Sequence, residues 1–138
     1  MKKQPHLDTY TTVYPIDIVV ANEYVTAKQL QELFTYSDGN EIEDSFLDKS
    51  YTATTVGFFR RRSDGKLVSF IVYLRDTDIK TDVKADRVNT YAHEAAHAAM
   101  DIFKYIGATI SSYTDDQEAF AYLIGYIAEC IYKTINKK

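Results

Sequence analysis

Two strand-like segments joined by a tight turn constrain the fold of this chain most strongly. Residues 51–62 and 66–76 are rich in β-branched and aromatic side chains, and Ser63, Asp64 and Gly65 separate them. Asp-Gly between two such runs is typical of a β-hairpin, because glycine readily adopts the positive φ that a tight turn requires. The sequence therefore predicts an antiparallel pair of strands in the middle of the chain.

A further strand and a short helix are expected before this hairpin. Residues 10–21 are rich in Thr, Val, Ile and Tyr, which favours a strand, and Pro15 marks an edge, a bulge or a break in it. Thr26 is a suitable N-cap for a helix that runs to Phe34. The acidic segment 41–50 is expected to be mainly loop.

Two longer helices are expected after the hairpin. From about residue 82 the apolar positions recur with the period of a helix up to Ile106, and Gly107 is a suitable C-terminal cap. Thr114 and Gln117 have the spacing of a capping box, which opens a last helix that ends near residue 135. The expected fold class is therefore α+β, with an antiparallel or mixed sheet of about three strands packed on these two helices.

Length and composition narrow the class of protein. A chain of 138 residues with 46% hydrophobic and 26% charged residues is expected to form one globular domain over residues 1–138. The formal net charge of −4 argues against nucleic acid or an anionic membrane as the partner. No apolar run is long enough to span a bilayer, and a single cysteine fits a reducing compartment. We therefore expect a cytoplasmic protein.

The first of the two long helices contains His-Glu-x-x-His. His93 and His97 are two of the three histidines in the chain, and their spacing places both imidazoles on one helix face, one turn apart. Glu94 would lie beside the open position of a bound metal, where it can accept a proton from water. The alanines around the motif also fit a second interpretation, a helix that packs tightly against a neighbouring element.

A catalytic zinc needs a third protein ligand, and no histidine follows His97. The downstream candidates are carboxylates, namely Asp101, Asp115, Asp116, Glu118 and Glu129. Acidic residues at the start of a helix are also favoured by its dipole, so Asp115, Asp116 and Glu118 have this second explanation.

The motif and the order of the expected elements resemble the gluzincin branch of zinc metallopeptidases, over roughly residues 51–130. In that family a glutamate on the next helix follows the second histidine by about twenty residues or more, and Glu118 follows His97 by 118 − 97 = 21 positions. The resemblance implies a small zincin-like domain that binds Zn²⁺ through His93, His97 and Glu118. It also implies that Glu94 is the general base, that the substrate is a peptide or protein, and that segment 66–76 is an edge strand that aligns the substrate.

The chain departs from the family pattern at two points. Tyr122 stands where the thermolysin group has an acidic residue that supports the site, and no arginine follows Arg87 to stabilise an oxyanion. Tyr113 is the first candidate for that role, with Tyr122 and Tyr126 after it. Small proteins with this motif also occur among phage and mobile-element genes, and a non-catalytic interaction module or a structural zinc-binding protein is the alternative function.

Overall fold

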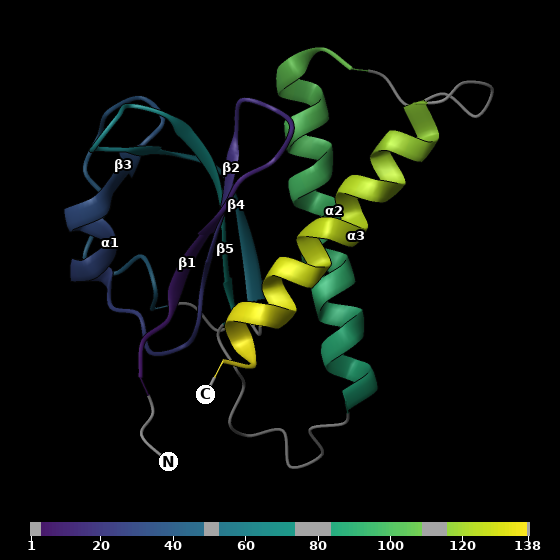
Figure 1. Ribbon diagram of the computed structural model, residues 1–138. Helices are drawn as coiled ribbons and strands as arrows, with labels where there is room; N and C mark the ends of the chain where they lie inside the picture. The colour runs from purple at the N-terminus through teal and green to yellow at the C-terminus, as the bar shows by residue number, and fades with distance from the viewer. Residues whose placement is uncertain (1–3, 49–52, 74–83, 109–115, 138) are drawn as a thin grey trace.

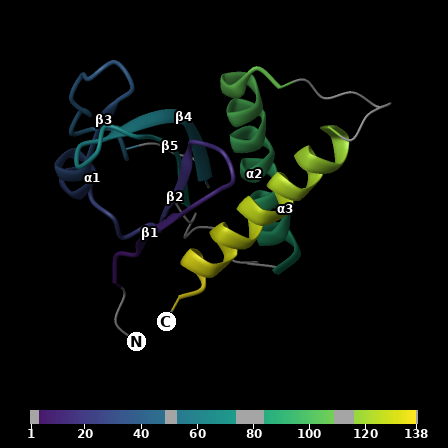
Figure 2. The same ribbon diagram turned by 45° about the horizontal axis from the view of Figure 1, so that its top comes forward.

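A five-stranded mixed sheet lies between two long helices on one face and a short helix on the other (Figures 1 and 2). The computed structural model describes residues 4–48, 53–73, 84–108 and 116–137. Within these residues the fold is α+β, as the sequence predicts. The two ends of the described chain lie near each other, below the sheet in the view of Figure 1.

The strands run in the order β1-β2-β5-β4-β3 across the sheet. Their bounds are Leu7–Tyr10 for β1, Asp17–Ala21 for β2, Phe34–Tyr36 for β3, Ala53–Arg61 for β4 and Leu67–Tyr73 for β5. β2 pairs with β5 in parallel, and the other three pairs are antiparallel. The predicted hairpin is confirmed as β4 and β5, and Gly65 in its turn has a φ of 70°.

The sheet is larger than the predicted sheet of about three strands. The predicted strand 10–21 is instead the end of β1, a loop around Pro15 and β2, and β1 begins three residues earlier, at Leu7. The loop turns the chain back, so β1 and β2 pair antiparallel. Thr12 fixes this loop: its Oγ1 accepts from the backbone N–H of Tyr14 at 3.0 Å and lies 2.7 Å from the carbonyl oxygen of Ile16, to which it donates. Phe34, expected at the end of a helix, instead begins β3, and its side chain is buried in the cluster that also contains Leu30 of the preceding helix.

The expectation that segment 66–76 forms an edge strand is wrong. β5 has β2 on one side and β4 on the other, and six of its seven residues are buried. Burial on both faces is typical of a central strand with a parallel neighbour. An open edge belongs to β4 instead. In the described part of the chain, β3 pairs only with Phe59–Arg61 of β4, so residues 53–58 have no strand on their outer side.

The three helices follow the predicted signals closely. α1 spans Ala27–Leu33 and begins with a complete capping box between Thr26 and Gln29. α2 spans Lys84–Ile106 and ends at Gly107, whose φ is 76°. α3 spans Asp116–Ile135; Thr114, its predicted cap, lies outside the described residues. No helix in the described ranges combines the length and the apolar character that a membrane span requires.

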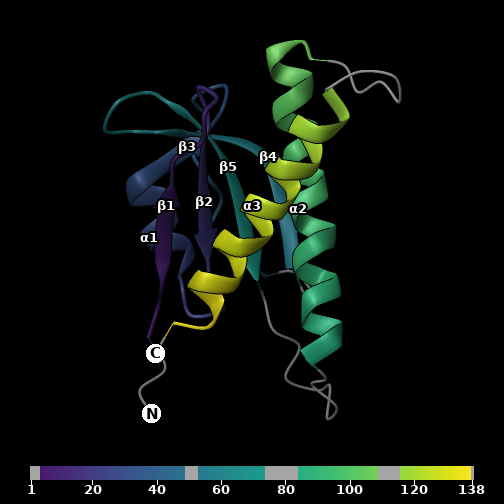
Figure 3. The same ribbon diagram turned by 45° about the vertical axis from the view of Figure 1, so that its right-hand side comes forward.

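The buried side chains form two clusters, one on each face of the sheet. The first joins the sheet to α2 and α3 and includes Ile18, Ile71, Ala98, Ile102 and Ile127. The second lies between the sheet, α1 and the loop after β3, and includes Val19, Leu30, Phe34, Phe59 and Phe70. Over the first cluster, α2 lies against β4 and β5, while α3 crosses β2 and β1 (Figures 1 and 3). One side of α2 therefore faces β4.

Candidate metal centre

The two histidines of the motif lie one turn apart on an exposed face of α2. Their Nε2 atoms are 3.2 Å apart, and the side chain of His93 is 66% exposed. Two nitrogen ligands held at 2.0–2.1 Å by one tetrahedral zinc ion lie about 3.3 Å from each other. The separation of the two imidazoles therefore fits a shared zinc ion. It also fits a direct hydrogen bond between two neutral rings.

The carboxylate of Glu94 reaches the sheet, and only 7% of the residue is exposed. The hydroxyl of Thr55, on β4, lies 2.8 Å from Glu94 Oε1 and 3.1 Å from the Glu94 carbonyl oxygen. The second carboxylate oxygen, Oε2, lies 3.8 Å from His93 Nε2. One oxygen is thus held by β4, and the other faces the imidazole pair.

Small side chains bring this face of α2 close to the sheet. Ala95, Ala98 and Ala99 are fully buried, and each presents only a methyl group to its neighbours. Because no longer side chain separates α2 from the strands, Glu94 can reach the hydroxyl of Thr55. The interpretation of the alanines around the motif as packing residues is confirmed for these three, whereas Ala92 is exposed and Ala96 is only partly buried. The packing is compatible with a metal at the histidines.

The structure does not bring Glu118 together with the histidines. No group of three His, Cys, Asp or Glu residues that could hold a metal exists within the described ranges. Phe120, two residues after Glu118, packs against Phe103 with the ring centroids 5.2 Å apart. Phe103 follows His97 by six residues, which is about 9 Å along the helix axis. Glu118 instead lies on the surface of α3, beside Tyr122.

Asp101 is the next candidate for the third ligand. Asp101 lies one turn beyond His97 on α2 and is partly buried. Burial raises the pKa of its carboxyl, and the nearby His97 and Lys104 counteract part of this effect. Asp115 and Tyr113 lie outside the described residues, as does the side chain of Asp116. Asp101 is therefore a candidate whose carboxyl interacts electrostatically with a motif histidine.

Tyr122 and Tyr126, the alternative oxyanion donors on α3, lie beside the loop that joins β1 to β2. The Tyr126 hydroxyl donates to the carbonyl oxygen of Thr11 at 2.6 Å, and Tyr122 is largely exposed beside the same loop. Thr55 is the residue that sequence reasoning missed. It is 39 positions from Glu94, and nothing in a strand of threonines and valines marks one hydroxyl as the partner of a distant carboxylate.

No family model, curated protein or solved structure matches this chain.

Proposed function

We propose that this protein is a zinc-dependent hydrolase of peptide bonds whose site lies on the face of α2 that carries His93, Glu94 and His97. The observation that carries the proposal is the 3.2 Å separation of the two Nε2 atoms, with a glutamate oxygen 3.8 Å from one of them. An imidazole pair at zinc-ligand spacing beside a buried carboxylate supplies two ligands and the general base of metal-assisted hydrolysis.

The chain's own residues have distinct roles in this proposal. A zinc ion held by His93 and His97 would supply Lewis acidity and lower the pKa of a water molecule. Glu94 accepts the proton of that water through Oε2 and passes it to the nitrogen of the leaving amine. Thr55 holds Oε1, so the carboxylate cannot rotate away from the imidazoles. The burial of Glu94 keeps bulk water from competing for its oxygens.

The open edge of β4 supports a peptide as the substrate. Residues 53–58 include Thr55, and their outer backbone groups have no strand partner in the described part of the chain. An extended peptide can add to such an edge through backbone hydrogen bonds. This edge takes the role that the sequence assigned to segment 66–76. It would place a substrate backbone along the strand that carries Thr55, the hydrogen-bond partner of Glu94.

A metal-free interaction module is the second candidate function, and one observation favours it. The same 3.2 Å separation is satisfied by a hydrogen bond between the two neutral imidazoles, and no third ligand joins them in the described part of the chain. The two functions differ in the metal content of the protein. They also differ in the effect of replacing Glu94.

Elemental analysis of the purified, untagged protein tests the metal. We expect near-stoichiometric zinc in the wild type, a loss of zinc in His93→Ala and His97→Ala, and no change in His6→Ala, which removes the one histidine outside the motif. Parallel variants Glu118→Ala and Asp101→Ala identify the third ligand. A wild type that stays free of zinc after incubation with the metal would refute the proposal and leave the interaction module.

Hydrolysis is then tested with quenched fluorescent peptides of mixed sequence. Glu94→Gln is expected to abolish cleavage and to keep its zinc, because the amide cannot accept the proton and Glu94 is not a ligand. Cleavage that persists in Glu94→Gln would remove this residue from the mechanism. Bound zinc without any cleavage in the wild type would indicate a structural zinc site.

A further inference from the structure

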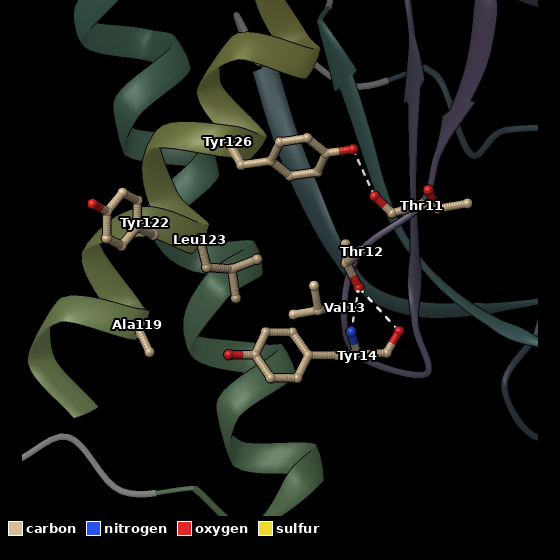
Figure 4. A pocket seen from close by; sticks show the side chains of 8 residues that line it. All are labelled: Thr11, Thr12, Val13, Tyr14, Ala119, Tyr122, Leu123 and Tyr126. Carbon is tan, nitrogen blue, oxygen red and sulfur yellow. Dashed lines mark hydrogen bonds between the residues drawn. The ribbon is translucent and has the colours of Figure 1, made fainter. Parts of the chain in front are cut away.

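A groove lies between α3 and the loop that joins β1 to β2, separate from the histidine face of α2. Its volume is about 490 Å³, within the range of pockets that bind ligands. We call it the tyrosine groove, and its lining residues are Thr11, Thr12, Val13, Tyr14, Ala119, Tyr122, Leu123 and Tyr126. Figure 4 shows Tyr126 and Tyr14 at its two ends, with Val13 and Leu123 between them.

The walls of the tyrosine groove are fixed by the fold. The hydrogen bond from Tyr126 to the Thr11 carbonyl joins α3 to the loop at one end. At the other end, the ring of Tyr14 packs edge-on against Phe103 of α2, with the centroids 5.8 Å apart. The bonds of Thr12 Oγ1 within the loop hold the segment between these two contacts. A partner would therefore meet a preformed surface, which lowers the entropic cost of binding.

Apolar side chains at the rim of this groove face water. Val13 is 93% exposed and Tyr122 is 73% exposed, although both border an apolar hollow. Neither side chain is therefore part of the buried core. Apolar and aromatic groups gathered around a concave surface mark interaction sites more often than scattered exposed residues do.

Two glutamates lie beside the tyrosine groove. None of the eight lining residues is charged, and a neighbouring hollow shares Tyr122 and Tyr126 with the groove. The charged residues that line this second hollow are Glu118 and Glu129. Glu129 forms an ion pair with Lys133 at 3.0 Å, whereas Glu118 has no basic partner among the described residues. The surface is thus apolar in the centre and negative on one side.

We propose that the tyrosine groove is a docking site for a partner protein, through a segment that combines an apolar side chain with a nearby lysine or arginine. The apolar side chain fills the hollow between Val13 and Leu123, and the basic group lies beside Glu118. A second copy of this chain fits poorly, because it carries a net charge of −4 and would bring the same carboxylates to the interface. The docking site does not depend on the proposed hydrolase activity.

Selection from a displayed library of random heptapeptides on the wild-type protein tests the chemistry of the partner. We expect the enriched peptides to share an apolar residue with a lysine or arginine within three positions of it. Affinities of a selected peptide are then measured by fluorescence anisotropy. Val13→Ser and Tyr122→Ser are expected to weaken binding about tenfold, through the loss of apolar contact. Val88→Ser is the matched control, because Val88 is an exposed valine on α2.

Charge is tested separately. Glu118→Gln is expected to weaken binding about threefold, the effect of one exposed ion pair, and to reduce its dependence on salt. Glu32→Gln, a change of an exposed glutamate on α1, should have no effect. Three results would overturn the proposal: enriched peptides without basic residues, equal binding by the groove variants and the wild type, or a dimer that Val13→Ser disrupts. The last would identify a second copy as the occupant.

Discussion

Replacing Thr55 by valine tests the contact that holds Glu94 in place. Valine keeps the shape of threonine and removes the hydroxyl, which lies 2.8 Å from Glu94 Oε1. The side chain of Glu94 is only 9% exposed, so water cannot easily replace the lost donor. A hydrogen bond to a charged group contributes about 1.5–3 kcal/mol. We therefore expect Thr55→Val to lower the free energy of unfolding by about 2 kcal/mol.

Urea denaturation followed by circular dichroism measures this loss. With a dependence of about 2 kcal/mol per molar urea for a small domain, the midpoint should fall by about 1 M. Thr55→Ser keeps the hydroxyl and is the control, with a midpoint close to that of the wild type. A Thr55→Val protein as stable as the wild type, or a Thr55→Ser protein that is equally destabilised, would refute the reasoning.

A double-mutant cycle isolates the charge in this interaction. In a Glu94→Gln background the acceptor is neutral, and a neutral hydrogen bond contributes only about 1 kcal/mol. The effect of Thr55→Val should therefore fall by about 1 kcal/mol in that background. Equal effects in both backgrounds would show that Thr55 acts through packing rather than through the carboxylate.

Two further predictions concern other parts of the fold. Burial raises the pKa of Asp8, but the hydrogen bonds from Lys137 and Thr134 together lower it by more than burial raises it. The pKa of Asp8 in the folded protein is therefore below its ordinary value of 3.8. The stabilisation is then present above the ordinary pKa and is lost as pH falls through the lower, folded value. Lys137→Met should reduce stability by less than about 1 kcal/mol at pH 7, and urea midpoints at pH 2 should no longer differ. Burial raises the pKa of the Cys130 thiol to about 11, so the folded protein should react with Ellman's reagent at pH 8 only as fast as it unfolds.

The elements that the sequence predicts well are those with local causes. Gly65 follows Asp64 in the hairpin turn, Thr26 caps α1, and Gly107 ends α2, and each signal acts within a few residues. Helical periodicity likewise places the core of α2 and α3. These features need no knowledge of the rest of the chain.

The errors concern pairing between distant segments. The central position of β5 depends on its parallel partner β2, about fifty residues earlier, and its own sequence is equally compatible with an edge. β3 has only three residues, and it exists because Phe34 is buried against Phe59 and pairs with Arg61. The third ligand stays a prediction for the same reason. A spacing of 21 residues fixes the distance along the chain and not the direction in which α3 leaves the loop.

This difference between local and distant contacts also separates the two parts of the proposed site. The spacing of His93 and His97 is a property of α2 itself, because any regular helix places residues four apart on one face. The orientation of Glu94 depends on β4, since Thr55 holds one of its oxygens and the buried alanines set the distance between helix and sheet. A change that moves α2 away from β4 would therefore impair proton transfer and leave the imidazole pair intact. Loss of hydrolysis with zinc retained thus points to the contact between α2 and β4, whereas loss of both points to damage within α2.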